Sequence, residues 1–149
     1  MDKCSKVAAL YIATLKAMTL IHQHSHWTTG GRIFYGDHLL FMRIYESAQE
    51  NLDQAAEKFI GLQFEGVMDY DYQNELLSKV LSKYSKLDGS PLEMSLAIEK
   101  EFVAFSKGAY ECFEAEGKMT LGLDDMIMAI ANKREESIYL LQQPLKGQS

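Results

Sequence analysis

Apolar residues recur every three to four positions along most of the chain, which is the spacing of one face of an α-helix. This pattern predicts a first helix from about Ser5 to Trp27 and a longer second helix from about Phe34 to Leu62. Gly30 and Gly31 lie between them and permit a tight reversal of the chain. The two helices are therefore expected to be joined by a short turn.

The second half of the chain predicts two more long helices. A short amphipathic helix around Leu76 to Tyr84 comes first, in an otherwise polar connection. The sequence Ser90-Pro91-Leu92-Glu93 is a capping box with proline at the first helical position, so a third long helix begins there and continues to about Gly117. The last helix follows Thr120 or Gly122 and is expected to end before Pro144.

Four long helices, with a short helix in the connection between the second and the third, predict a definite fold class. This is an all-α, ferritin-like four-helix bundle, which has one long crossover. The chain has 149 residues, which suits one hydrophobic core rather than two. We therefore expect a single ferritin-like domain over residues 1–149.

Charge and composition narrow the range of partners. The net charge is -6 and no cluster of Lys and Arg is present, which argues against tight binding to DNA. No stretch reaches the ~20 apolar residues of a membrane-spanning helix. Thr14 and Lys16 interrupt the apolar run that most resembles a signal peptide. We expect a soluble, cytoplasmic protein with no membrane partner and with weak or no DNA binding.

All four histidines lie between residues 22 and 38, and three of them are in the sequence HQHSHW at the end of the first helix. His22 and His26 are one turn apart and share a face, whereas His24 points elsewhere. The turn between the helices brings His26 close to His38. These histidines are either metal ligands or ordinary residues that cap or line a helix end.

Asp53 and Glu57 form a carboxylate pair one turn apart on the second helix, on the same stripe as His38. They are either metal ligands or part of the solvated side of an amphipathic helix. His38 and Asp53 are ~22 Å apart along one helix, so one metal ion cannot join them within a chain. If two copies of the helix pack antiparallel about a two-fold axis near Tyr45, however, His38 of one copy faces Asp53 and Glu57 of the other.

Such a site contains mixed imidazole and carboxylate ligands with open positions. This set suits ferrous iron, and zinc or manganese would also bind to it. Di-iron proteins of the ferritin type use Glu-x-x-His motifs to hold metal inside one bundle, and this chain contains no such motif. The predicted metal site therefore lies between subunits.

Two histidines and two carboxylates at these spacings resemble the signature of the Dps-like mini-ferritins, which reads His-Trp, a glycine turn, a second His, and then Asp-x-x-x-Glu. The residues that carry the resemblance are His26-Trp27, Gly31, Phe34, His38, Asp53 and Glu57. The resemblance implies a homo-oligomer, a dodecamer built from two-fold dimers, that oxidises Fe2+ with hydrogen peroxide or dioxygen and stores it as ferric mineral. It further implies that His26 and His38 of one chain, with Asp53 and Glu57 of its partner, are the catalytic metal ligands, and that Trp27 lies near the site.

One position departs from the family pattern. Met42 stands four residues after the second histidine, where the family commonly has an acidic residue, and a thioether is a poor ligand for iron. An alternative function is therefore a ferritin-like structural oligomer with impaired ferroxidase activity. A third is a zinc or copper carrier or sensor that uses HQHSHW.

Asp124 and Asp125 lie at the start of the last helix and are candidates for an acidic pore through which iron enters the oligomer. The alternative for this pair is structural, because acidic residues in the first turn stabilise a helix N-terminus.

Overall fold

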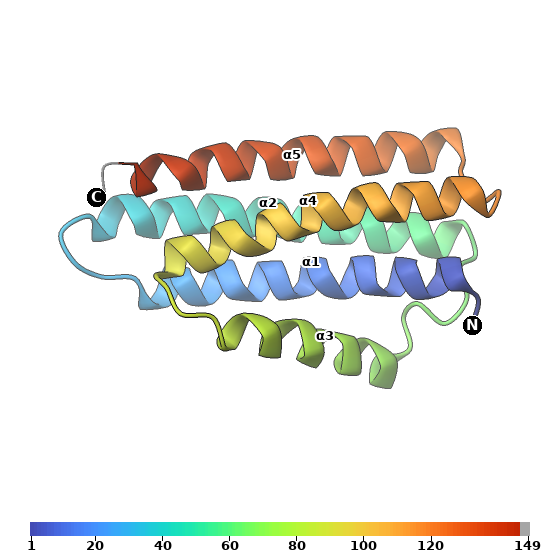
Figure 1. Cartoon of the computed structure of the whole chain (residues 1–149), viewed down its shortest axis with the longest axis horizontal. Coiled ribbons are helices and arrows are strands. Elements are labelled where there is room, and N and C mark those ends of the chain that lie inside the picture. The colour runs from blue at the N-terminus through green and yellow to red at the C-terminus, as the bar shows by residue number, and fades with distance from the viewer. Residues whose placement is uncertain (147–149) are drawn as a thin grey trace.

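The computed structural model describes residues 1–146. In this range the chain is entirely helical apart from its turns and loops. Four long helices run along a common axis, and a fifth, shorter helix lies outside them (Figure 1). The all-α, ferritin-like four-helix bundle with a crossover helix is therefore confirmed. The helices are α1 (Lys3–Thr28), α2 (Phe34–Gly61), α3 (Tyr70–Ser85), α4 (Pro91–Ala115) and α5 (Leu121–Leu145).

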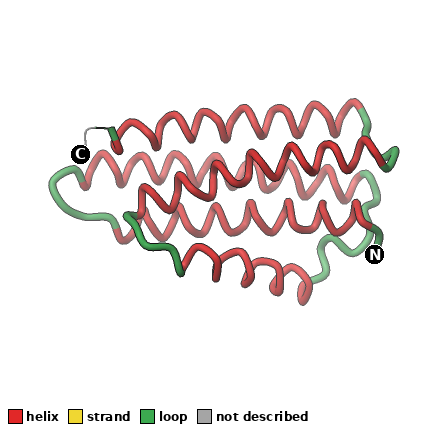
Figure 2. Tube along the Cα trace, viewed as in Figure 1, coloured by secondary structure: helices red, strands yellow, loops and turns green. Residues whose placement is uncertain are grey.

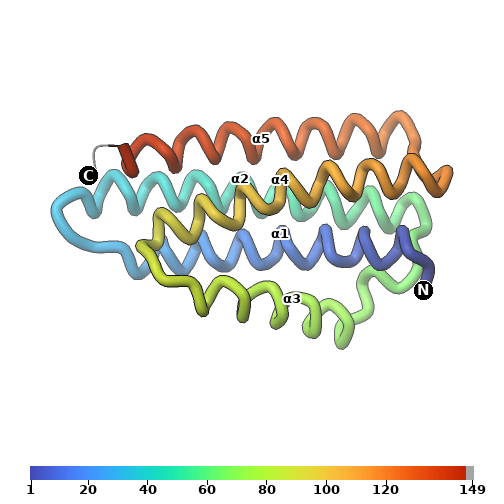
Figure 3. The backbone as a smooth tube through the Cα atoms, in the orientation of Figure 1, coloured from blue at the N-terminus to red at the C-terminus, as the bar shows by residue number. Residues whose placement is uncertain are grey.

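The long helices form two antiparallel pairs, α1 with α2 and α4 with α5 (Figure 3). α1 also contacts α4 on one side and the crossover helix α3 on another, so it is the most enclosed helix of the bundle. The short turn between α1 and α2 lies at the end of the bundle where α5 finishes, whereas the N-terminus lies at the opposite end, near the turn between α4 and α5 (Figure 2).

Polar caps set where the helices begin. The Ser90 side chain accepts a hydrogen bond from the backbone N–H of Glu93, and Pro91 is the first residue of α4, as the capping box predicts. The Thr120 side chain accepts from the backbone N–H of Leu123, so Thr120 rather than Gly122 caps α5. The turn between α1 and α2 includes Gly31 at φ +96°, a conformation that favours glycine.

Two helix boundaries differ from the prediction. The crossover helix begins at Tyr70, earlier than the apolar pattern indicates, because Asp69 caps it by accepting from the backbone N–H of Tyr72. The expected end of the last helix before Pro144 is wrong, since α5 continues to Leu145. A proline in the final turn of a helix removes a single N–H bond and has little helix left to disrupt.

The core is centred on α1. Tyr11 is fully buried, and its ring makes edge contacts with Phe59 of α2 and Phe102 of α4, with centroids 5.5 and 4.9 Å apart. Contrary to the expectation from the sequence, α1 is long and apolar enough to cross a membrane by length and composition alone. In this fold 67% of that apolar stretch is buried inside the protein, so packing in the core accounts for its composition.

Candidate metal centre

The turn between α1 and α2 brings His26 and His38 together in a reciprocal arrangement. His26 Nδ1 lies 2.6 Å from the backbone oxygen of His38, and His38 Nδ1 lies 2.7 Å from the backbone oxygen of His26. Because a carbonyl oxygen can only accept, each Nδ1 carries the proton and donates it. In the neutral rings, both Nε2 atoms are then unprotonated and have a lone pair available for a ligand.

The environment of the pair holds both rings in place. They are stacked, with centroids 3.7 Å apart. Tyr45 packs edge-on against His26 and Phe34 lies against His38, with centroids at 5.4 and 5.0 Å. His26 is buried and His38 is half-buried. Among the residues that the structure describes, none forms a hydrogen bond with either Nε2 atom. The imidazole pair is therefore oriented by the backbone and keeps one nitrogen of each ring unused.

Asp53 and Glu57 lie further along α2 and are exposed. The two carboxylates are on the same continuous helix as His38, as expected, so a single subunit does not bring them to the histidine pair. Within residues 1–146, no three His, Cys, Asp or Glu side chains are close enough to hold one metal ion. The assignment of His26, His38, Asp53 and Glu57 as ligands of one site therefore remains a prediction about two subunits.

Glu57 and Asp125 line one open groove between α2 and α5. Its volume is about 410 Å³, and Lys58 and Gln54 also border it. Asp125 is exposed, whereas one carboxylate oxygen of Asp124 is buried without a hydrogen-bond partner in the described part of the chain. The two acidic residues thus have different surroundings, and their role in a pore stays a prediction.

Trp27 follows His26 at the end of α1, and Met42 follows His38 on α2. Trp27 is 62% exposed and lies against the ring of His24, with centroids 5.4 Å apart. Its indole therefore does not pack inside this subunit's bundle. Met42 is half-buried, one helical turn beyond His38.

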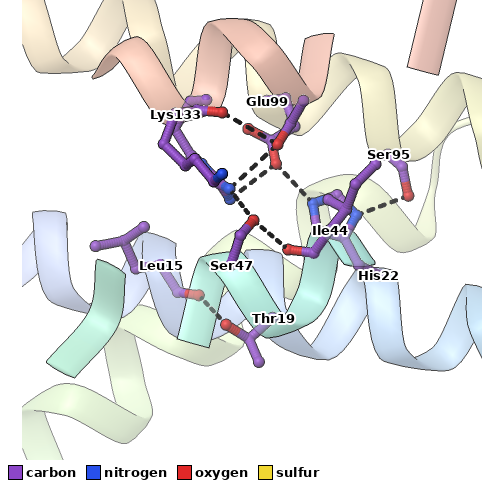
Figure 4. Close-up of polar contacts among 10 residues, drawn as sticks. Leu15, Thr19, His22, Ile44, Ser47, Ser95, Glu99 and Lys133 are labelled. Atoms are coloured by element: carbon purple, nitrogen blue, oxygen red, sulfur yellow. Dashed lines mark hydrogen bonds and ion pairs between the residues drawn. The ribbon is translucent and has the colours of Figure 1, made fainter. Parts of the chain in front are cut away.

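His22 belongs to a buried polar network that the sequence analysis did not predict. It is fully buried, with Nε2 2.9 Å from Glu99 Oε1 and Nδ1 2.9 Å from Ser95 Oγ (Figure 4). Arg134 Nη1 donates to the same Glu99 oxygen at 3.1 Å. The sequence does contain a signal for this buried network, because a charged residue stands among the apolar positions of each of the two helices. Arg134 lies between Ile130 and Ile138 in the last helix, and Glu99 follows Ile98 in the third long helix.

Further hydroxyl groups surround this buried network. Arg134 Nη2 donates to the Ser137 hydroxyl at 3.2 Å and to the Ser47 hydroxyl. Burial lowers the pKa of Arg134, and the negative charge of Glu99 opposes that shift. Di-iron bundle proteins place their metal ligands in the bundle interior. The interior of this bundle instead contains the ion pair of Arg134 and Glu99. The guanidinium group of Arg134 supplies the positive charge there.

The three histidines of HQHSHW therefore do not share a site. His22 binds Glu99 in the interior, His24 is exposed beside Trp27, and His26 faces His38. Within residues 1–146 of one subunit, these side chains form no common metal site, and a zinc or copper carrier built on this motif stays a prediction.

These features define a ferritin-like bundle with a histidine pair at its α1–α2 turn, and similar solved structures exist. They include Dps from Thermosynechococcus elongatus (19% identity, TM-score 0.81, covering 98% of this chain and 92% of that one). An archaeal Dps homologue from Halobacterium salinarum has 17% identity and a TM-score of 0.80, over 99% of this chain and 81% of that one. Dps from Microbacterium arborescens in the high iron form has 16% identity and a TM-score of 0.75, over 95% and 91%.

The chain therefore has the fold of the Dps-like mini-ferritins, as the sequence resemblance predicts. No protein-family model and no curated protein sequence matches it.

Proposed function

We propose that this chain is the subunit of an iron-oxidising and iron-storing homo-oligomer. Ferrous iron is its substrate and binds between two subunits, where hydrogen peroxide or dioxygen oxidises it. The ferric product is stored as mineral in the cavity of the oligomer. In this proposal the ligands are His26 and His38 of one subunit together with Asp53 and Glu57 of its partner. Glu57 acts as a bridging ligand.

The observation that carries the proposal is the reciprocal hydrogen bonding of His26 and His38. Metal-binding histidines usually donate their second ring N–H to a carbonyl or carboxylate, which fixes the tautomer and the orientation of the ring. Both histidines meet that condition before any metal binds, with Nδ1–oxygen distances of 2.6 and 2.7 Å. A pair of capping histidines would not need this mutual arrangement.

Two-fold pairing of α2 supplies the carboxylates. In an antiparallel pair centred near Tyr45 and Glu46, His38 lies opposite the partner's Asp53, so one dimer contains two equivalent sites. Large apolar side chains exposed around the α1–α2 turn support contact at this end of the bundle, because exposed apolar surface often marks an interaction site. They are Trp27, Ile33, Phe34, Tyr35 and Leu39.

The chemistry requires only that the site hold ferrous ions and admit the oxidant. Hydrogen peroxide accepts two electrons, so each molecule oxidises two ferrous ions and, with two protons, leaves as two water molecules. The neutral imidazoles bind the metal without adding charge, and the carboxylates favour the ferric state because they neutralise its higher charge. Zinc or manganese would compete for the same ligands.

The rest of the assembly follows from the same resemblance. We propose a cytoplasmic dodecamer built from these dimers, with Asp124 and Asp125 near the pore through which iron enters. Binding to DNA is not part of the proposal, because the net charge of -6 disfavours contact with phosphates.

Met42 supports a second candidate function. It lies one turn beyond His38, where an acidic side chain would add a hard oxygen ligand, and a thioether binds iron poorly. The alternative is a ferritin-like structural oligomer that assembles through the same interface but oxidises iron inefficiently.

Ferrous oxidation by the purified apo-protein tests the proposal. The absorbance of ferric products is followed after addition of Fe2+ with peroxide or with air, for the wild type and for His38→Ala, Asp53→Ala and His24→Ala. His24 is exposed outside the proposed site, so that variant is the matched control. We expect the first two substitutions to abolish the fast phase and the control to keep it. If the wild type equals a protein-free solution while still forming a large oligomer, the structural alternative takes its place.

Mixed oligomers test the shared site more directly. A dimer of one His38→Ala subunit and one Asp53→Ala subunit has one site lacking both residues and one site with both intact. Co-assembly of the two inactive variants should therefore restore part of the fast phase. If both ligands came from the same subunit, mixing would restore none of it.

A further inference from the structure

Two thiols from distant parts of the sequence lie side by side at one end of the bundle. Cys4 is in the first turns of α1, and Cys112, 108 residues later, is in the last turn of α4. Their sulfur atoms are 3.9 Å apart, and Cys4 Sγ is also 3.9 Å from the backbone oxygen of Cys112. Because both residues are on helices that pack against each other, the fold itself sets this proximity.

We propose that Cys4 and Cys112 form a dithiol site that reacts with a hydroperoxide and becomes an intramolecular disulfide joining α1 to α4. A disulfide has its sulfur atoms about 2.0 Å apart, so the two atoms must approach by roughly 2 Å. Because both residues lie within one turn of a helix end, side-chain rotation and a small adjustment of those two ends would bring the sulfur atoms together.

The different exposure of the two thiols sets the order of the reaction. Cys4 is only 2% exposed, whereas Cys112 is half-buried, so the peroxide reaches Cys112 first. The Cys112 thiolate attacks one peroxide oxygen, an S–O bond forms as the O–O bond breaks, and hydroxide leaves and is protonated to water. Cys4 then gives up its proton and attacks the sulfenic sulfur of Cys112, and the second oxygen leaves as water. Two thiols and one peroxide thus become one disulfide and two water molecules.

The surroundings of Cys4 support this order. Burial raises the pKa of the Cys4 thiol to about 11, and the Cys112 side chain and the carboxylates of Glu116 and Asp2 add to the effect. Since the thiolate is the nucleophile in both steps, Cys4 is poorly suited to make the first attack, and its sulfur, 3.9 Å from that of Cys112, resolves the sulfenic acid because it lies next to it. The site should therefore respond to sustained peroxide rather than remove it rapidly.

The disulfide would link the most enclosed helix of the bundle to α4 and close a loop that contains α2 and α3. Such a cross-link restricts the unfolded chain, so the oxidised subunit should resist unfolding. Cys4 and His26 are at opposite ends of α1, ~33 Å apart along the helix. The thiol reaction therefore does not depend on the proposed iron site.

The experiment uses the full-length apo-protein, reduced and then freed of reductant. The folded protein is exposed to hydrogen peroxide, the remaining thiols are alkylated before denaturation, and intact mass and peptide maps are recorded without reduction. We expect a loss of about 2 Da, a cross-linked peptide pair containing Cys4 and Cys112, and reversal by dithiothreitol. The unfolding temperature of the oxidised wild type should rise by several degrees, whereas that of peroxide-treated Cys4→Ser should not.

Protein unfolded in guanidinium before oxidation is the control for proximity, and the bond should form many-fold more slowly there. Three results would overturn the proposal. They are persistence of both thiols, disulfides that form only between subunits, or a gain of oxygen at Cys112 without a cross-link to Cys4. Each is read from the mass spectrum of the wild type, so the conclusion does not require the variant to fold.

Discussion

His22 and His26 are one turn apart on the same helix, yet they belong to two different kinds of site. Both nitrogens of His22 are occupied, by Glu99 and Ser95, in the interior of the bundle. His26 uses only Nδ1, for the backbone of His38, and its Nε2 has no hydrogen-bond partner among the described residues. A histidine with both nitrogens paired inside its own chain holds a structure together, whereas one with an oriented, unused nitrogen can accept a ligand.

The balance of charge separates the two regions further. The buried network contains its own cation and anion, Arg134 and Glu99, which meet at 3.1 Å. The histidine pair consists of two imidazole rings, and no carboxylate in the same subunit completes a three-ligand group within residues 1–146. The buried network is complete in one chain, whereas the proposed metal site would take its carboxylates from a second subunit.

Glu99→Gln breaks the complete site. The amide keeps the shape of the side chain but leaves the guanidinium of Arg134 buried without its counter-charge, and removing one partner of a buried ion pair costs about 3–5 kcal/mol. Urea-induced unfolding of the apo-protein, followed by circular dichroism, measures the loss.

The double variant Glu99→Gln/Arg134→Met is its control. Removing both charges should recover most of the lost free energy of unfolding, because no uncompensated ion then remains in the core. A single variant within about 1 kcal/mol of the wild type would contradict the structural role assigned to this network.

His22→Ala and His26→Ala sharpen the contrast, because each should affect a different property. His26→Ala should weaken binding of Fe2+, or of Zn2+ as a redox-inert probe, by about 10- to 100-fold, with a small change in stability. His22→Ala should leave metal binding unchanged but lower the free energy of unfolding by about 1–3 kcal/mol, because it removes a partner from buried polar groups. Calorimetric titration and urea unfolding measure the two effects, and loss of metal binding in His22→Ala would contradict the division.

Most of the fold could be predicted from local signals. Helical periodicity, the Ser90 capping box and the glycine turn place four long helices and one crossover helix, and the structure confirms them. The errors came where one residue overrides the pattern. Asp69 starts α3 six residues before its first predicted apolar position at Leu76, and Pro144 is tolerated because it falls in the final turn of α5.

The site could be predicted only in part. Proximity of His26 and His38 follows from the short turn, but their reciprocal bonds to backbone oxygens do not, because these depend on the exact path of the turn. The association of His22, Glu99 and Arg134 depends on how three helices are rotated about their axes. Sequence spacing shows which residues share a face of one helix, but not which face of another helix lies opposite.

Met42→Asp tests whether the open site lacks an anion. An aspartate one turn beyond His38 would add a negative charge from the same subunit to the proposed metal site, and we expect Zn2+ or Fe2+ affinity to rise about tenfold. Met42→Leu is the matched control, because it keeps an apolar side chain of similar volume and should bind as the wild type does. Equal affinities for the aspartate and leucine variants would mean that residue 42 does not face the metal.

The smallest change in stability is expected for an exposed ion pair, Lys83 with Glu101. Comparing it with the buried pair measures how strongly burial increases the cost of removing one partner. Lys83 Nζ lies 2.8 Å from Glu101 Oε2, and the two side chains are 60% and 50% exposed. Burial alone would raise the pKa of Glu101, but hydrogen bonds from Lys83 and Tyr84 outweigh it and hold the pKa below its ordinary value of 4.5. A carboxyl whose pKa is lowered on folding stabilises the protein above its unfolded-state pKa, and that contribution is lost as the pH falls through the folded-state value.

Lys83→Ala should therefore cost no more than about 1 kcal/mol near pH 7, less in high salt, and almost nothing near pH 2. The measurement is urea unfolding at each pH and salt concentration, and a cost as large as that of Glu99→Gln would mean that burial is not what distinguishes the two ion pairs.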